Sequence, residues 1–181
     1  MSKVLIVILI LAAALRFIGI YPGFNRYHSD EPIIYGNAVD MIANNTLDTR
    51  DYYYSSLTTY INYAFFRFFF IPLSWLSYYF QHIDELSKGL VQIPIAPLEA
   101  RKIFWEEIAG FRAINALYWG RYITALFSFG SVVLTYLIGK KLFNKEVGLI
   151  SAFLLAVNYK SVIYAHLGLP DTYSAFFLTL A

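Results

Sequence analysis

The sequence contains no cysteine, and charged residues make up only 14% of its 181 positions. The lack of cysteine excludes a disulfide framework, a thiol nucleophile and a thiolate metal site. An average soluble domain has about 25% charged residues, so this shortage indicates that much of the surface faces something other than water. The formal net charge is only +2, without the basic footprint of a nucleic-acid-binding protein, and no nucleic-acid partner is expected.

Apolar residues take the place of the missing charge. The chain is 59% hydrophobic and 19% aromatic, which indicates an integral membrane protein. A helix rises about 1.5 Å per residue and needs roughly 20 apolar residues to cross a bilayer. The sequence predicts spans at 4–20, 113–139 and 147–167, and the start of a further span at 171–181. Because the last run has only about half the length of a span, we expect the chain to be the N-terminal fragment of a longer protein.

The first apolar run has a competing interpretation as a secretory signal peptide, because it is close to the N-terminus and follows Lys3. Arg16, Phe17 and Ile20 leave no pair of small residues at which such a peptide would be cleaved. We therefore expect an uncleaved first span whose N-terminus lies in the cytoplasm.

Residues 21–112 separate the first two predicted spans, and two parts of this segment have helical character. Near 31–44, apolar residues recur at helical spacing, which predicts an amphipathic helix lying along the membrane surface. These residues are Ile34, Ala38, Met41 and Ile42. The stretch 57–80 is long enough to span, but Arg67 would be costly in lipid and Pro72 would break or kink a helix. An interfacial or re-entrant element is expected there.

The lysines at 140–145 form the densest basic cluster of the chain, in a short loop, which favours the cytoplasmic side. If the N-terminus is also cytoplasmic, an even number of crossings separates the two, so 57–80 would not cross. Asp30 and Asp171 would then share the extracytoplasmic face. If 57–80 did cross, these two acids would lie on opposite sides; the charge bias favours the first arrangement.

Four polar side chains near the ends of the predicted spans have two interpretations each. Asp30 is equally suited to cap a helix and to act as a general base. Glu31 either orients an acceptor or favours the helix N-terminus electrostatically. Asp171 also suits a helix cap, and a histidine such as His166 is more often an interfacial residue with a water partner. As a pair, His166 and Asp171 could instead bind an acceptor or help to hold a divalent ion, so a metal requirement stays open.

A series of short motifs follows the first span in a fixed order. An Asp-Glu pair opens a surface helix, and an aromatic-rich apolar stretch comes next. The later motifs are Gly120–Phe127, Leu137–Phe143, Val147–Leu149, and His166 and Asp171 ahead of Ala175–Ala181. In this order the chain resembles the N-terminal part of the GT-C membrane glycosyltransferases, in the protein O-mannosyltransferase and aminoarabinose-transferase-like branch. The resemblance covers nearly the whole chain apart from 81–112.

The resemblance implies an all-α polytopic fold in the plasma membrane, with interfacial helices in a large extracytoplasmic first loop. It implies an inverting enzyme that transfers a sugar from a polyprenyl-phosphate donor, on the extracytoplasmic side, to a hydroxyl or phosphate of a protein, lipid or glycan acceptor. The base of the family falls on Asp30, with Glu31 beside it. Asp171 and His166 would form a second acidic site for the acceptor or a metal.

The departing phosphate of such a donor calls for arginine or lysine. Arg26, Arg50 and Arg121 are the candidates, although Arg121 could equally extend its charge to the membrane interface. A polytopic transporter or flippase is one alternative function, and it predicts that charges within spans, such as Arg67, face one another. A non-catalytic membrane scaffold is the other, and it predicts that Asp30→Asn has no effect on sugar transfer.

Overall fold

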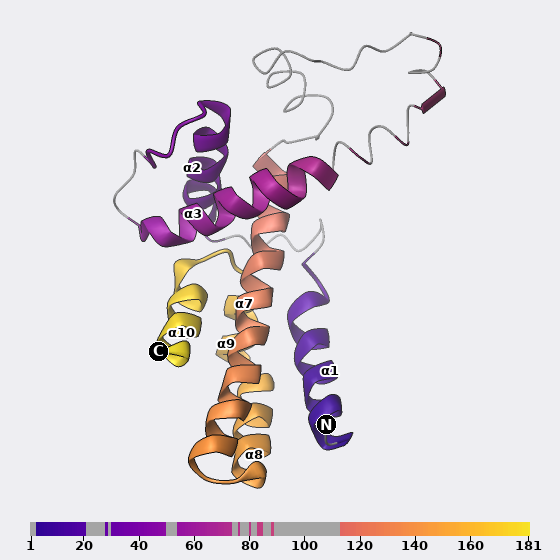
Figure 1. Cartoon of the computed structure of the whole chain (residues 1–181), viewed down its shortest axis with the longest axis vertical. Coiled ribbons are helices and arrows are strands. Elements are labelled where there is room, and N and C mark those ends of the chain that lie inside the picture. Colours follow the sequence, from indigo (N-terminus) through magenta and orange to yellow (C-terminus); the bar gives the residue numbers. More distant parts are fainter. Residues whose placement is uncertain are drawn as a thin grey trace. The chain divides into compact units, whose positions relative to one another are not determined.

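The computed structural model describes residues 3–20, 28, 30–49, 54–73, 76, 80, 83, 84, 88 and 113–181. Over these residues the regular structure is helical and contains no strand, which confirms the all-α prediction (Figure 1). The elements are α1 (Lys3–Phe17), α2 (Glu31–Ala43), α3 (Ser56–Phe65), the π-helix η1 (Phe66–Phe70), α7 (Ala113–Leu142), α8 (Lys145–Ala156), α9 (Tyr159–Ala165) and α10 (Pro170–Leu180).

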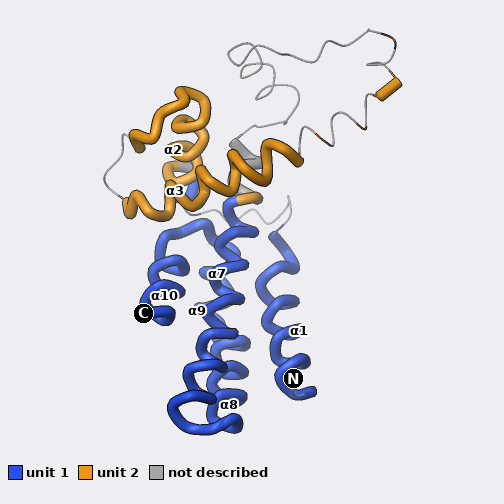
Figure 2. Tube along the Cα trace, viewed as in Figure 1, with its two compact units in different colours: residues 1–31, 120–181 blue, residues 32–119 orange. Residues whose placement is uncertain are grey.

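The chain divides into two compact units (Figure 2). The first unit comprises residues 1–31 and 120–181, and the second comprises residues 32–119. Every predicted site residue that the structure describes belongs to the first unit. Two of the predicted donor-phosphate residues, Arg26 and Arg50, lie outside the described residues.

The core of the first unit lies where α1, α7 and α8 pack together. It contains apolar side chains from all three helices, spaced three or four residues apart as one helix face requires. These residues are Leu5, Ile8, Ala12, Val132, Tyr136, Ala152 and Ala156. The alanines allow the helix backbones to approach closely, and the larger side chains fill the space on either side.

Two glycines allow α7 and α8 to approach closely in their hairpin, and a helix cap begins α8. A Cβ atom added to Gly139 would lie 2.8 Å from the Cα of Gly148, so the two helices touch backbone to backbone there. The side chain of Asn144 accepts a hydrogen bond from the N–H of Val147 and caps the start of α8. Lys140 and Lys141 lie in the last turn of α7, so the predicted basic loop is this hairpin.

One helix in the described part of the chain, α7 over Tyr118–Leu142, is long and apolar enough to cross a membrane. Its position agrees with the predicted span at 113–139. Helix α1 has 15 residues and a length of about 22 Å, which is shorter than the roughly 30 Å of a hydrocarbon core. The multi-pass arrangement therefore stays a prediction.

The predicted span at 147–167 is not one straight helix, because α8 and α9 meet at an angle of 60°. In an unbroken helix the carbonyls of Leu155 and Ala156 would accept from the N–H groups four residues later. Here the guanidinium of Arg16 donates to both carbonyls, at 3.0 and 2.9 Å. The side chain of Asn158 then caps α9 by accepting from the N–H of Ser161 at 2.9 Å. The last carbonyls of α8 and an N–H group in the first turn of α9 therefore have hydrogen-bond partners although the helix is interrupted.

Helix α10 joins the first unit through aromatic packing against α7. The Phe127 ring lies 4.8 Å from that of Tyr173 and 5.0 Å from that of Phe176, centroid to centroid. Gly130 makes room for this contact, since a Cβ atom there would lie 2.7 Å from the Phe176 ring. The hydroxyls of Thr124 and Tyr173 lie 3.2 Å apart in the same interface.

The second unit contains α2 from Pro32 onward, α3 and η1. The four apolar residues predicted to share one face of the first amphipathic helix are all buried, which confirms that pattern: Ile34, Ala38, Met41 and Ile42. Helix α3 continues into the π turn η1, where the Ile71 N–H bonds to the Phe66 carbonyl five residues back. Pro72, which lacks an N–H, follows directly. The irregularity expected from Pro72 is therefore a widened turn just before it.

Candidate functional site

Glu31 and Arg121 form a buried ion pair at one end of the first unit. Arg121 Nε donates to Glu31 Oε1 at 3.1 Å, and Nη2 donates to Oε2 at 2.8 Å. The side chains are 0% exposed for Glu31 and 1% for Arg121. This two-pronged geometry matches the planar fork of a guanidinium to the two oxygens of a carboxylate, which is the strongest arrangement of such a pair.

Two backbone N–H groups complete the surroundings of the Glu31 carboxylate. The N–H of Gly168 donates to Oε1 at 2.5 Å, and the N–H of His28 donates to Oε2 at 3.2 Å. Each carboxylate oxygen therefore accepts two hydrogen bonds. Through this carboxylate, Glu31 connects to two places that are distant in sequence: the helix α7 and the turn between α9 and α10.

The structure therefore gives both members of this pair an internal role. Arg121 was predicted as a donor-phosphate contact or an interfacial residue, but its guanidinium lies buried on Glu31. Glu31 was predicted either to orient an acceptor or to favour the helix N-terminus. It is the first residue of α2, yet its carboxylate is directed to Arg121 and Gly168. A charge this deeply buried needs such partners to be tolerated.

Asp30 differs sharply from its neighbour in exposure. It precedes the first residue of α2, and its side chain is 31% exposed, against 0% for Glu31. Its Oδ2 atom lies 3.4 Å from Nδ1 of His28, whose side chain is 47% exposed. The His28 carbonyl also accepts the N–H of Glu31 at 3.2 Å. Solvent or a substrate can therefore reach the Asp30 carboxylate. The backbone on either side of Asp30 is held by the hydrogen bonds between His28 and Glu31.

The structure does not join the predicted pair His166 and Asp171. His166 ends α9, with Nδ1 lying 2.8 Å from the Val162 carbonyl and Nε2 lying 2.9 Å from the Ile18 carbonyl. Both ring nitrogens are thus engaged with backbone oxygens. Asp171 lies in the first turn of α10 and is exposed. In the described part of the chain, no three His, Asp or Glu side chains are placed to share a metal ion.

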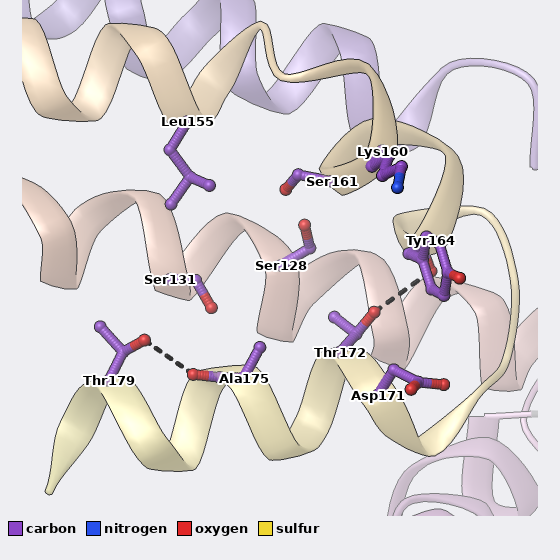
Figure 3. A pocket seen from close by; sticks show the side chains of 10 residues that line it. All are labelled: Ser128, Ser131, Leu155, Lys160, Ser161, Tyr164, Asp171, Thr172, Ala175 and Thr179. Carbon is purple, nitrogen blue, oxygen red and sulfur yellow. Dashed lines mark hydrogen bonds between the residues drawn. The ribbon is translucent and has the colours of Figure 1, made fainter.

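A pocket of about 280 Å³ lies between α7, α8, α9 and α10 (Figure 3). Asp171 and Lys160 contribute to its wall. Six of the residues around it carry hydroxyl groups: Ser128, Ser131, Ser161, Tyr164, Thr172 and Thr179. Its one signal in the sequence is that serine and threonine recur at helical spacing on the helices that flank it.

Arg16 lies behind this pocket and was not recognised as a site residue from the sequence. It is 0% exposed, and its guanidinium donates to the hydroxyls of Ser128 and Ser161 at 2.9 and 3.0 Å. The same group donates to carbonyls of α1 and α8. A charged residue inside a predicted membrane span often marks a functional site. Arg16 is such a residue, because it lies within the span predicted at 4–20.

Comparison of the chain with known protein families, curated proteins and solved structures finds no match. Proposals about its function therefore depend on the chemistry of the first unit and on the resemblance carried by its motifs.

Proposed function

We propose that the protein is a membrane glycosyltransferase that takes a sugar from a polyprenyl-phosphate donor. The acceptor is a hydroxyl or phosphate group presented on the extracytoplasmic side of the plasma membrane. Asp30 is the general base. The observation that carries the proposal is the contrast at the start of α2, where a buried carboxylate with four hydrogen-bond donors adjoins an accessible one.

This contrast suits two different roles for the adjacent acids, positioning for Glu31 and proton transfer for Asp30. A general base has to be within hydrogen-bond reach of the acceptor and must keep its position during the reaction. Glu31 supplies the fixed position, since the ion pair with Arg121 and the bond from Gly168 hold the residue next to Asp30. Asp30 supplies the accessible oxygen atoms. A residue that served only as a helix cap would not need a buried ion pair beside it.

The reaction would be a single displacement with inversion. With a hydroxyl acceptor, the oxygen attacks the anomeric carbon while its proton moves to the Asp30 carboxylate. The bond between the anomeric carbon and the phosphate oxygen breaks, and the phosphate leaves with the electron pair. Positive groups near the phosphate would stabilise the charge that develops there.

The position along α7 of the residue that binds Glu31 supports an extracytoplasmic site. Arg121, the partner of Glu31, lies about 20 residues before Lys141 on this helix, a rise of about 30 Å. This distance equals the approximate thickness of a hydrocarbon core. If the lysines of the hairpin lie in the cytoplasm, as short basic loops do, the Asp30 end of α7 reaches the opposite surface.

A transfer assay with an Asp30→Asn variant tests the proposal. Asparagine retains the size and the capping ability of aspartate but cannot take up the acceptor proton. We expect turnover to fall by about 100-fold or more, measured as release of polyprenyl phosphate from a panel of polyprenyl-phosphate sugars by membranes containing the full chain.

The matched control is Asp40→Asn, because Asp40 is an exposed acid on the same helix. It should leave turnover unchanged. Full turnover in the Asp30→Asn variant would rule out Asp30 as the base and would favour a scaffold instead.

A further inference from the structure

Arg16 is a buried cation whose partners are all electrically neutral. Its guanidinium donates to three backbone carbonyls, those of Ala12, Leu155 and Ala156, and to the two serine hydroxyls named above. Among the residues that the structure describes, no carboxylate lies within 4.0 Å of it. Burial of a charge without a counter-charge is unfavourable. An anion bound nearby would offset that cost.

The two serines transmit the charge of Arg16 to the pocket. Ser128 Oγ accepts from Nε at 2.9 Å and Ser161 Oγ accepts from Nη2 at 3.0 Å. A hydroxyl that accepts a hydrogen bond still has its own proton to donate, and donation becomes stronger when the accepted bond comes from a cation. Neither proton has an acceptor within the described part of the chain. Both serine side chains are among those that line the pocket (Figure 3).

Lys160 adds a second positive charge to the same side of the pocket. It precedes Ser161 on α9, its side chain is exposed, and it contributes to the pocket wall. Tyr164 follows one turn later with a phenol group. A volume of about 280 Å³ is at the lower end of the range for small-ligand pockets, so it suits a head group rather than a whole lipid.

We propose that this pocket binds the phosphate group of a phosphate ester. Phosphate oxygens would accept hydrogen bonds from Ser128, Ser161 and Lys160. Arg16 would stabilise them from behind, at about 5–6 Å, the length of two successive hydrogen bonds. The inference deepens the proposed function and rests on it for the choice of ester, since a lipid-linked phosphate is then the expected ligand.

Asp171 sets a limit on where the phosphate lies. It is the one carboxylate among the residues that line the pocket, and it belongs to α10, across from α9. Like charges repel, so the phosphate would lie on the α9 side, and Asp171 would face the group esterified to it. Asp171→Asn should therefore bind a simple prenyl phosphate as tightly as the unchanged protein or more tightly. Weaker binding by this variant would contradict the placement.

The test is a calorimetric titration of the purified full chain, in detergent micelles, with citronellyl phosphate, a ten-carbon prenyl phosphate. Lys160→Gln should weaken binding by about tenfold, since it removes one charge-assisted hydrogen bond. The double variant Ser128→Ala with Ser161→Ala should weaken it at least as much. Lys140→Gln is the control, because Lys140 is exposed on α7 and outside the pocket. Unchanged binding in both pocket variants would overturn the inference.

Three further titrations identify the source of the phosphate. Citronellol, which lacks the phosphate, should not bind, and binding as tight as that of the phosphate would overturn the site. Inorganic phosphate binding as tightly as citronellyl phosphate would overturn the lipid as the ligand. Competition by dioleoyl phosphatidylglycerol, mixed into the micelles at equal concentration, would overturn a prenyl lipid in favour of bulk phospholipid.

The binding test can fail separately from the proposed function. Asp30→Asn should abolish transfer and keep citronellyl phosphate binding. If pocket variants bind normally while Asp30→Asn is inactive, only the phosphate site is wrong. If pocket variants lose binding while Asp30→Asn still transfers sugar, only the assignment of the base is wrong.

Discussion

Two arginines are fully buried in the same unit of this protein, and their charges are satisfied in opposite ways. Arg121 pairs with the carboxylate of Glu31, so the local charge is neutral. The hydrogen-bond partners of Arg16 are carbonyls and hydroxyls, so its positive charge is not compensated by an anion among the described residues. The Glu31–Arg121 pair needs no external charge and holds the two side chains in a fixed position. An uncompensated cation beside a pocket attracts an anion from outside. The comparison separates a structural arginine from a ligand-directed one.

The largest effect is expected from Glu31→Ala, which leaves Arg121 buried without its carboxylate. Removal of one member of a buried pair typically lowers the free energy of unfolding by about 3–5 kcal/mol. Thermal unfolding of the protein in detergent, followed by circular dichroism, measures the change. Glu146→Ala is the control, because Glu146 is an exposed acid in the first turn of α8 and should cost less than about 1 kcal/mol.

A double variant shows whether the loss comes from the orphaned charge. Glu31→Leu with Arg121→Met replaces the pair by apolar side chains of similar size and should recover much of the stability. If Glu31→Ala unfolds at the same temperature as the control variant, the pair does not hold the backbone next to Asp30. The support that it gives to Asp30 would then be absent.

A smaller effect is expected from Arg16→Met. This change removes a cation and leaves no ionised group behind. The Ala156 carbonyl loses the bond from the guanidinium, whereas the Leu155 carbonyl keeps a bond from the Asn158 N–H. One hydrogen bond to a charged group contributes about 1.5–3 kcal/mol. We expect the net loss to stay near that value, because removing the buried charge also removes the cost of its desolvation. The same unfolding measurement applies, with Arg121→Met alone as the matched buried arginine. A larger loss for Arg16→Met than for Arg121→Met would reverse the order that the two environments imply.

Sequence patterns predicted the local features of the fold well. Helical spacing placed Ile34 and Met41 on the buried face of α2, because periodicity reports which side of a helix avoids water. Asp30 and Asp171 are predicted to share one face of the membrane. The structure joins their neighbours Glu31 and Gly168 by a hydrogen bond. Which side of a membrane they face stays a prediction.

The pattern could not reveal how the buried polar groups are paired. Glu31 and Arg121 are 90 positions apart, and Arg16 and Ser161 are 145 apart. Nothing in the local sequence specifies a partner at that distance. The break between α8 and α9 was missed for a related reason. An apolar run from Val147 onward satisfies the length rule for a span, whereas the carbonyls at the break accept hydrogen bonds from an arginine of a different helix.

The smallest effect tests whether Arg16 and the break act together. Asn158→Ala removes the cap of α9, and Asn144→Ala removes the equivalent cap of α8, in each case at a cost of about 1 kcal/mol. Only Asn158 lies at the break where Arg16 satisfies the carbonyls. In double variants with Arg16→Met, the cost of Asn158→Ala should therefore change by about 0.5 kcal/mol or more, while that of Asn144→Ala should simply add. Additive behaviour at both caps would mean that the bend forms without Arg16. The cation would then be buried for the pocket alone, which strengthens its role toward an anion and removes its role in the fold.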